Sequence, residues 1–310
     1  VRVDRLAGVE DPQVPDLADL EPDPDDRLLV LLELGALDQH VDQRLPLLGP
    51  AVQPIERRDL KGMAEIRRAA IGTCAAFREV ARRLADAEVA PNRELNLEGA
   101  PLTVGSLRRT IARVLAEHGL EQPDGNIVAP AEEGAMPHSA GTDGRTLRAG
   151  ESLVVDLYPK GTLFADCTRT FCVGSIPEPL AKAHAAVAQA LALAHAEVRA
   201  GVRGWSLQEK VCAELAARGY DTPITHPGTT RGYVHGLGHG VGYELHEAPS
   251  FRKHAGAEGV LGEGDVLTLE PGLYDLQDGW AVRLEDLVFL GPDGPENLTP
   301  LPYTLDPRAW

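Results

Sequence analysis

Two segments of this chain match each other without a gap, and this internal repeat constrains the fold more than any other feature. The segments are Leu147–Asp156, LRAGESLVVD, and Leu261–Glu270, LGEGDVLTLE. A leucine, a glycine, an acidic residue, a second leucine and a final carboxylate stand at the same offsets. A true duplication predicts two similar halves about a pseudo-twofold axis, which brings Asp156 and Glu270 toward each other. The alternative is that turn-then-strand patterns resemble one another by chance.

The elements predicted around the two segments follow the same order, helices first and strands after them. In the first half, the spacing of apolar residues predicts helices over 64–84 and 103–118, then strands over 126–129, 152–157 and 166–173. In the second half it predicts helices over 178–200 and 206–219, then strands over 266–270 and 280–290. Ser206 and Glu209 form a capping-box pattern at the start of the last helix. The prediction is an α+β fold.

A segment rich in glycine and histidine, Tyr233–Glu247, lies within the second half. Its four glycines, at 236, 238, 240 and 242, make a helix unfavourable. In an extended segment, all four would share one face, and His235 and His239 would lie on the other. The glycine face would allow close approach of another backbone, and the histidine face suggests a site. A tight turn with surface histidines is the alternative. A dinucleotide-binding GxGxxG motif fails, because Val241 or Tyr243 occupies its last position.

Composition excludes several functional classes. The 310 residues carry a formal net charge of -17, which argues against a nucleic-acid partner. No apolar run of about 18 residues or more is present, so we expect no membrane-spanning helix. The four cysteines form no CxxC pair, which favours reduced, mostly buried thiols and a cytoplasmic location.

The start of the chain differs in composition from the rest. Residues 1–26 are acidic and contain four prolines, and further prolines and a glycine lie between 46 and 54. We predict a small N-terminal region, residues 1–57, that is too poor in apolar residues for a core of its own. Residues 58–310 would form the main domain.

Four acids and one histidine are the candidate metal ligands: Asp156, Asp166, His239, Glu270 and Glu285. Each acid ends or interrupts an apolar strand, where a carboxylate is costly unless it is paired or binds a metal. Carboxylates with one imidazole suit divalent manganese, cobalt, iron or zinc. So many carboxylates suggest two ions, which together hold a hydroxide nucleophile and bind a carbonyl oxygen. For any single acid the alternative is a surface or ion-pair role, such as Glu285 with Arg283.

From about residue 61 onward, these residues resemble the pita-bread metallopeptidases. That family includes methionine aminopeptidase, Xaa-Pro aminopeptidase and Xaa-Pro dipeptidase (prolidase), with creatinase as a relative. The matching segments are Asp156-Leu-Tyr-Pro, Asp166-Cys-Thr-Arg-Thr-Phe, His235-Gly-Leu-Gly-His239-Gly-Val-Gly, His246-Glu-Ala-Pro, Leu269-Glu270-Pro-Gly and Val282-Arg-Leu-Glu285-Asp. The Thr-Arg-Thr-Phe and His-Glu-Ala-Pro segments look like the proline-specific branch. The resemblance implies a pita-bread fold and hydrolysis of Xaa-Pro bonds, most simply in dipeptides.

The resemblance also implies a role for each matching residue. One divalent ion would bind Asp156 and Asp166, and the other would bind Asp166, His239 and Glu270, with Glu285 bridging; Mn²⁺ is the first expectation and Co²⁺ or Zn²⁺ the alternatives. Glu270, His246 and His138 would be catalytic, with Glu270 moving protons. Substrate-binding residues would be His138, His235, His246 and Arg283. Thr168 would orient Asp166.

Three questions stay open at this level. Asp156 is followed by Leu-Tyr-Pro-Lys where Leu-Gly is common in the family, and its distance to Asp166 is ten residues, about one fewer than expected. The N-terminal region is much shorter than in the proline-specific relatives, where it covers the active site and adds to a dimer interface.

The expected partners are small proline-containing peptides and a second copy of the chain. The alternatives are an Xaa-Pro aminopeptidase acting on longer peptides, a methionine aminopeptidase-like activity, a creatinase-like hydrolase, and a pita-bread binding module without catalysis.

Overall fold

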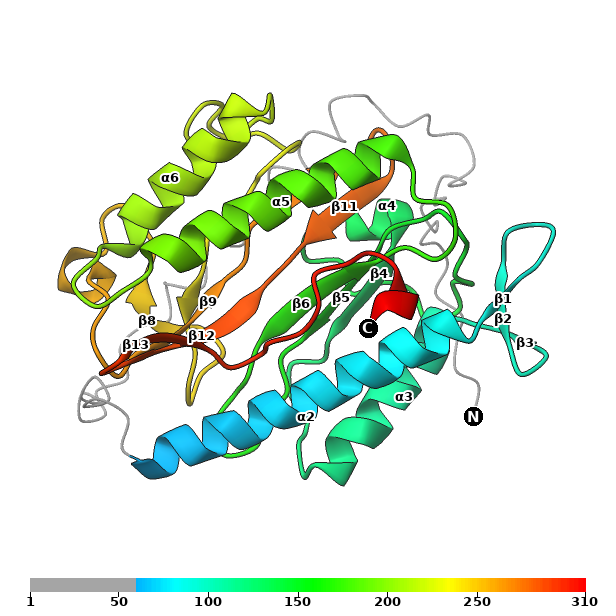
Figure 1. The fold of residues 1–310 in the computed structure, drawn as a ribbon, viewed down its shortest axis with the longest axis horizontal. Coiled ribbons are helices and arrows are strands. Elements are labelled where there is room, and N and C mark those ends of the chain that lie inside the picture. Colours follow the sequence, from blue (N-terminus) through cyan, green and yellow to red (C-terminus); the bar gives the residue numbers. More distant parts are fainter. Residues whose placement is uncertain (1–59) are drawn as a thin grey trace, which may run out of the picture. The chain divides into compact units, whose positions relative to one another are not determined.

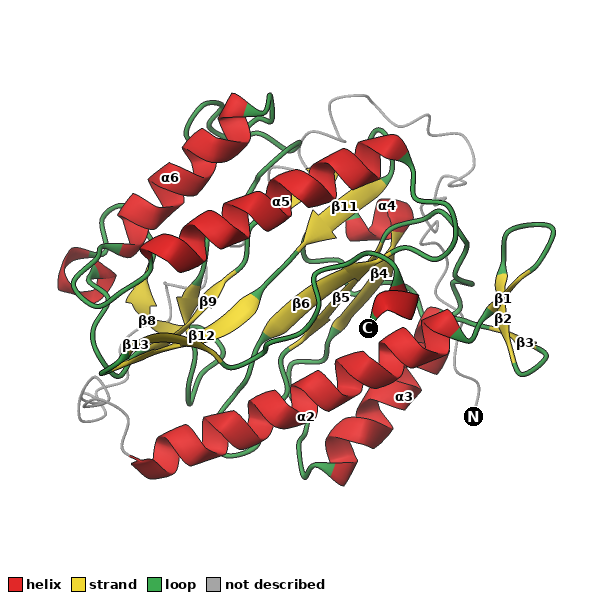
Figure 2. Ribbon diagram, in the orientation of Figure 1, coloured by secondary structure: helices red, strands yellow, loops and turns green. Residues whose placement is uncertain are grey.

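The computed structural model of this chain describes residues 60–310, in which two helix pairs flank a set of antiparallel strands (Figure 1). The predicted N-terminal region, residues 1–57, lies outside the described residues, and its boundary stays a prediction. Figure 2 shows α2 and α3 along one side of the strands and α5 and α6 along the other. This is the α+β arrangement that the repeat predicts.

The two halves contain equivalent elements in the same order. The first half contains α2 (Leu60–Ala85), α3 (Val104–Glu117), β4 (Ile127–Pro130), β5 (Leu153–Leu157) and β6 (Cys167–Phe171). The second contains α5 (Glu178–Glu197), α6 (Gly204–Ala217), β7 (His239–Gly240), β9 (Val266–Leu269) and β12 (Asp286–Gly291). Shorter elements join them: β1 (Glu88–Val89), β2 (Leu95–Leu97), β3 (Ala100–Pro101), α4 (Ala131–Gly134), β8 (Glu247–Ser250), β10 (Gly272–Asp275), β11 (Trp280–Arg283), β13 (Gly294–Asn297) and the 3₁₀ turns Gly256–Gly259 and Pro307–Ala309.

Strand pairing supports the duplication. Residues 60–310 form four sheets, of which one has the order β4-β5-β6 and another the order β13-β12-β9-β7-β8, so β5 and β9 are central in their respective sheets. The repeated leucines occupy equivalent registers, with Leu153 opposite Phe171 on β6 and Leu267 opposite Val288 on β12. All these pairs are antiparallel.

The turn that leads into each central strand is also the same in both halves. The repeated glycines, Gly150 and Gly264, have φ values of 81° and 93°, which a side chain disfavours. Each donates its N–H across the sheet, Gly150 to the carbonyl of Val173 at 2.8 Å and Gly264 to that of Leu290 at 2.7 Å. Both glycines are therefore required by the same turn conformation. Chance similarity of sequence would not explain this shared geometry.

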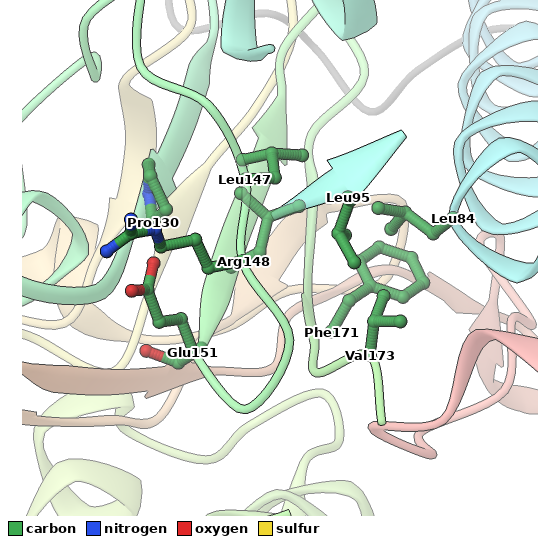
Figure 3. Close-up of a pocket in the computed structure, with 10 residues that line it drawn as sticks. Leu84, Leu95, Pro130, Leu147, Arg148, Glu151, Phe171 and Val173 are labelled. Atoms are coloured by element: carbon green, nitrogen blue, oxygen red, sulfur yellow. The ribbon is translucent and has the colours of Figure 1, made fainter. Parts of the chain in front are cut away.

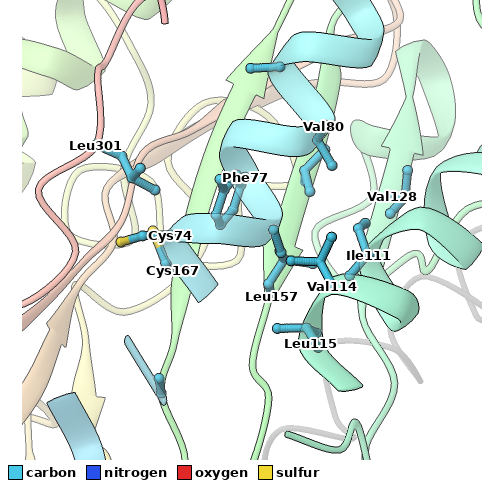
Figure 4. Close-up of a cluster of buried hydrophobic side chains, with 14 of the residues drawn as sticks. Cys74, Phe77, Val80, Ile111, Val114, Leu115, Val128, Leu157, Cys167 and Leu301 are labelled. Atoms are coloured by element: carbon cyan, nitrogen blue, oxygen red, sulfur yellow. The ribbon is translucent and has the colours of Figure 1, made fainter. Parts of the chain in front are cut away.

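Each helix pair packs an apolar face on the strands. Figure 4 shows part of the first core, where Phe77 and Val80 of α2 meet Ile111 of α3 and Leu157 of β5. A second core lies beneath α5 and α6 and includes Val187 among its buried residues. All four cysteines are free and buried, as expected. No helix within residues 60–310 is long and apolar enough to cross a bilayer.

The predicted capping box and one predicted continuous strand were wrong. Helix α6 begins at Gly204 rather than Ser206, and the Ser206 hydroxyl donates to the carbonyl of Arg203 instead of capping a helix start. The predicted strand over 280–290 is two strands, β11 and β12, interrupted at Glu285. An apolar run does not show such a break, because both halves of the run are buried.

The glycine-rich segment is not helical, and two of its glycines do meet a neighbouring backbone. A Cβ at Gly238 would stand 2.1 Å from the carbonyl oxygen of Thr268, and one at Gly240 would stand 2.0 Å from that of Ala248. A Cβ at Gly236 would meet nothing within 4 Å. The predicted close approach is therefore real at Gly238 and Gly240 but not at Gly236.

This contrast within one motif gives a stability prediction. We expect Gly238→Ala to destabilise the fold by about 1–3 kcal/mol, because the new methyl group would push β9 away. Gly236→Ala, the matched control, should change stability little. Thermal unfolding of both variants measures the difference, at roughly 2–4 °C per kcal/mol for domains of comparable size. Equal unfolding temperatures for the two variants would show that β9 moves freely at this contact.

Candidate metal centre

The five predicted ligands converge where the two halves meet. Asp156 is on β5, and Asp166 directly precedes β6. From the second half, His239 begins β7, Glu270 directly follows β9, and Glu285 occupies the break between β11 and β12. Breaks and ends of strands thus present four of the five side chains, and Asp156 lies one residue before the end of β5, which explains why the acids interrupt apolar runs.

Short distances join four of the five side chains around one point. His239 Nε2 lies 3.7 Å from Asp166 Oδ2 and 3.6 Å from Glu270 Oε1. Ligand atoms of Asp166, His239 and Glu285 all lie within 4.8 Å of one another. These spacings allow a divalent ion to contact three or more of the residues after small side-chain movements.

Asp156 is the fifth residue, and its two oxygens have different surroundings. Arg283 Nη2 donates to Asp156 Oδ2 at 2.6 Å. Asp156 Oδ1 is buried and has no hydrogen-bond partner within the described part of the chain. A buried carboxylate oxygen without a partner is costly, and a cation would satisfy it. The donor set therefore fits a metal centre.

Burial and mutual repulsion make full ionisation of this cluster unfavourable. Burial is the largest cause that raises the pKa of Asp166 well above its usual value, followed by the charges of Glu285, Asp156 and Glu270. The pKa of Glu285 is likewise raised well above its usual value, first by burial and then by Glu270 and Asp156. Divalent cations would remove this repulsion, so metal binding would also release protons.

His239 has the form that a metal ligand requires. Burial, followed by the nearby His246, lowers its pKa to about 3, so the imidazole is neutral at physiological pH. Its Nδ1 lies 3.1 Å from the carbonyl oxygen of Gly240, which assigns the ring proton to Nδ1 as the hydrogen-bond donor. The lone pair of Nε2 then faces Asp166 and Glu270.

Thr168 and Arg283 both contact a predicted ligand, but neither contacts the one that the sequence suggested. The hydroxyl of Thr168 donates to Glu285 Oε2 at 2.7 Å, so the expectation that Thr168 orients Asp166 was wrong. The backbone explains this, because Glu285 N–H donates to the carbonyl of Thr168 at 3.0 Å and places the two residues side by side. Arg283 pairs with Asp156 and not with Glu285, so the simple ion-pair alternative for Glu285 does not hold.

Three other histidines were predicted for this site: His246, His235 and His138. The ring centroid of His246, an exposed residue, is 4.2 Å from that of His239. The pKa of His235 is lowered to about 3, first by burial, then by Arg283, with exposed His138 a smaller cause. His246 therefore lies against a candidate ligand, and His138 directly follows Pro137, whose carbonyl accepts from Arg283 Nη1 at 3.2 Å.

Sequence reasoning missed Tyr274 at this site. Its hydroxyl lies 2.8 Å from His235 Nε2 and accepts from Arg283 Nη1 at 2.9 Å, so it links two of the predicted substrate-binding residues. Tyr274 is on β10, a four-residue strand that was not predicted. Such a short strand has no periodicity to reveal it, and a tyrosine four residues after Glu270 carries no signal by itself.

A small cavity elsewhere in the fold is separate from this centre. Leu84, Leu95, Leu147 and Phe171 line its apolar part, and Arg148 and Glu151 lie at its other end (Figure 3). None of the predicted site residues lines it. The candidate site therefore stands on the convergent ligands and not on the presence of a cavity.

Comparison with known proteins decides which family has this arrangement. The family model described as metallopeptidase family M24 matches residues 64–292, which is most of the chain. The chain belongs to metallopeptidase family M24. The enzymes of M24 use two metal ions, and the candidate cluster lies inside the matched residues.

Several M24 proteins with names from the proline-specific branch are similar to this chain. An Xaa-Pro dipeptidase of Pyrococcus furiosus is 33% identical over 207 residues, which cover 64% of this chain and 55% of that protein. Xaa-Pro aminopeptidase 2 of Streptomyces coelicolor is 30% identical over 276 residues, which cover 82% of this chain and 56% of that protein. The chain thus spans little more than half the length of these curated relatives.

Solved structures confirm the pita-bread M24 fold. The prolidase from Pyrococcus horikoshii OT3 aligns with a TM-score of 0.67 and 26% identity, covering 80% of this chain and 65% of that one. The X-Pro aminopeptidase from Thermotoga maritima MSB8 aligns with a TM-score of 0.65 and 25% identity, covering 80% of this chain and 63% of that one.

Proposed function

We propose that this chain is a metal-dependent Xaa-Pro dipeptidase, which hydrolyses the peptide bond before proline in dipeptides. The observation that supports this most strongly is the convergence of four carboxylates and one neutral imidazole where the two halves meet. Similarity to Xaa-Pro dipeptidases supports the choice of bond. A binding module without catalysis is less favoured, because every predicted ligand is present and none has been replaced.

The proposed ligands divide between two divalent ions. Asp156 and Asp166 would hold one ion, Asp166, His239 and Glu270 the other, and Glu285 would bridge them. The unpartnered oxygen of Asp156 and the neutral His239 support this assignment. When bound, the ions supply Lewis-acid activation of water and of the scissile carbonyl. Mn²⁺ is the metal to test first, with Co²⁺ and Zn²⁺ as alternatives.

Three residues would carry the proton and substrate steps. Glu270 would accept the proton of the attacking water and deliver it to the leaving proline nitrogen. His246 would donate a hydrogen bond to the substrate carbonyl, and His138 would lie beside the scissile bond. The position of His246 against His239 supports the first of these two histidine roles. His235 and Arg283 would bind the substrate, and their hydrogen bonds with the Tyr274 hydroxyl would hold both in place.

Proline release from Ala-Pro and Met-Pro tests the proposal. Metal-stripped protein should be inactive, and activity should return with Mn²⁺, whereas Ala-Ala should remain intact. Ala-Pro-Ala separates the two proline-specific activities, because an Xaa-Pro aminopeptidase would cleave it. Two bound metals with no cleavage of any of these peptides would contradict the proposal and favour a non-peptide substrate or a binding role.

An Xaa-Pro aminopeptidase acting on longer peptides is the second candidate. It is supported by similarity to Xaa-Pro aminopeptidase 2, which covers more of this chain than the dipeptidase matches do. The expected homodimer stays a prediction from the family resemblance, and the cytoplasmic location stays a prediction from the cysteine pattern.

A further inference from the structure

Tyr158 is the residue at which this chain departs from the Leu-Gly expected after the first aspartate. It stands two residues after Asp156, just beyond the end of β5. Alternate residues of an extended segment share a face, so Tyr158 belongs with Val154 and Asp156. It packs against a buried cluster that includes Val154, Tyr274 and Ile127, the residue opposite Asp156 on β4. The ring therefore lies on the face of the sheet that carries the candidate metal centre.

The hydroxyl of Tyr158 is near several charges but is not bonded to them. Burial raises its pKa, and Asp156 and then Asp166 raise it further, so both carboxylates lie close enough to act on it. The exposed Asp124 adds another negative charge, and Arg283 opposes them. That arginine already donates to Asp156. Within residues 60–310, the structure shows no hydrogen bond of the Tyr158 hydroxyl, so this group is available to a ligand.

We infer that Tyr158 is a specificity-determining residue that accepts a hydrogen bond from the free α-amino group of the peptide substrate. The inference rests on the proposed peptidase function. A phenol oxygen accepts from an ammonium group, and the face of the ring attracts the same positive charge. Asp124 lies outside the predicted ligand set, so its charge would still favour a cation after metals neutralise the other carboxylates. The matching group of a dipeptide is its N-terminal amine.

The variant Tyr158→Phe keeps the ring and removes only the hydroxyl. With the metal-loaded enzyme, we expect KM for Ala-Pro to rise about tenfold, because a hydrogen bond to a charged group is lost, and kcat to change little. Propionyl-proline, which is Ala-Pro without the amino group, should be cleaved equally well by both enzymes. Tyr220→Phe, a half-buried tyrosine beyond the end of α6, is the matched control and should change neither substrate.

Distinct outcomes would overturn the inference. An unchanged KM for Ala-Pro, or an equal rise in KM for Ala-Pro and propionyl-proline, would show that the Tyr158 hydroxyl does not contact the substrate amine. A loss on Ala-Pro that disappears with alanyl-prolinamide would assign the hydroxyl to the substrate carboxylate instead. If the wild-type enzyme cleaves no Xaa-Pro dipeptide, the proposed function fails separately. Calorimetric binding of Ala-Pro then decides the inference, because equal affinity of wild type and Tyr158→Phe, or no binding to either, contradicts it.

Discussion

Replacing Asp166 with asparagine is expected to lower kcat/KM for Ala-Pro by about 1000-fold or more. Asp166 is the proposed ligand of both ions, and an amide cannot supply the same charge to either. Its carboxylate lies 3.7 Å from His239, so the substitution should also weaken binding at the site that His239 completes. Activity over a range of Mn²⁺ concentrations, with the bound metal counted for each protein, measures both effects.

The same variant should have the opposite effect on the metal-free fold. Because burial and neighbouring carboxylates raise the pKa of Asp166, its ionised form destabilises the folded state. Its favourable contribution is complete below the pKa of the unfolded chain and is lost as the pH rises through the higher folded pKa. At neutral pH, in the presence of a chelator, Asp166→Asn should therefore unfold at a higher temperature than wild type.

The control for this pair of measurements is Glu209→Gln, which removes an exposed acid from α6. It should keep wild-type activity and stability. If Asp166→Asn retained activity, the proposed ligand set would be wrong. If Asp166→Asn destabilised the metal-free protein, the Asp166 carboxylate would be stabilised by favourable contacts within the protein and would not need a metal ion.

Replacing Arg169 with methionine should cause the largest loss of stability. Arg169 is fully buried and donates to Asp286 Oδ1 at 2.7 Å, and Asp286 is fully buried as well. The arginine also donates to the carbonyls of Glu285 at 2.5 Å and Thr168 at 2.9 Å, which directly ties it to the metal centre. Removing one partner of a buried ion pair costs about 3–5 kcal/mol, since the other charge is left behind.

Chemical denaturation measures this loss, and two further variants interpret it. The double variant Arg169→Met with Asp286→Asn should recover part of the stability, because the remaining charge is also removed. Recovery should be incomplete, since His195 and Tyr303 also contact Asp286. Arg82→Met, on the exposed face of α2, is the control and should change little. A small loss for Arg169→Met would show that water or His195 compensates the buried acid.

Much of this fold was predictable because its signals are local. The apolar residues that recur every three or four positions along α2 predicted that helix. The matching Gly150 and Gly264 predicted the duplication, and their shared turn geometry provides its physical cause. Burial of a carboxylate needs a reason, so Asp156 and Glu285 were conspicuous within apolar runs.

The remaining features depend on contacts between distant segments. Thr168 bonds Glu285 because a backbone hydrogen bond aligns residues far apart in the chain, which no local pattern contains. Tyr274 acts from a strand too short to have a period. In the sequence, Arg169 is only one residue of the Thr-Arg-Thr-Phe motif, although its bonds to the carbonyls of Thr168 and Glu285 fix the backbone at the site.

Because the proposed ligands come from both halves of the chain, metal binding would also affect how firmly the two halves are held together. Asp156 and Asp166 come from the first half, and His239, Glu270 and Glu285 come from the second. An ion held by both groups would act as a reversible crosslink between segments far apart in the chain. Free metal concentration would then set the cohesion of the two halves as well as the rate of reaction. Removal of metal would therefore weaken the contact between the two halves at the candidate metal centre.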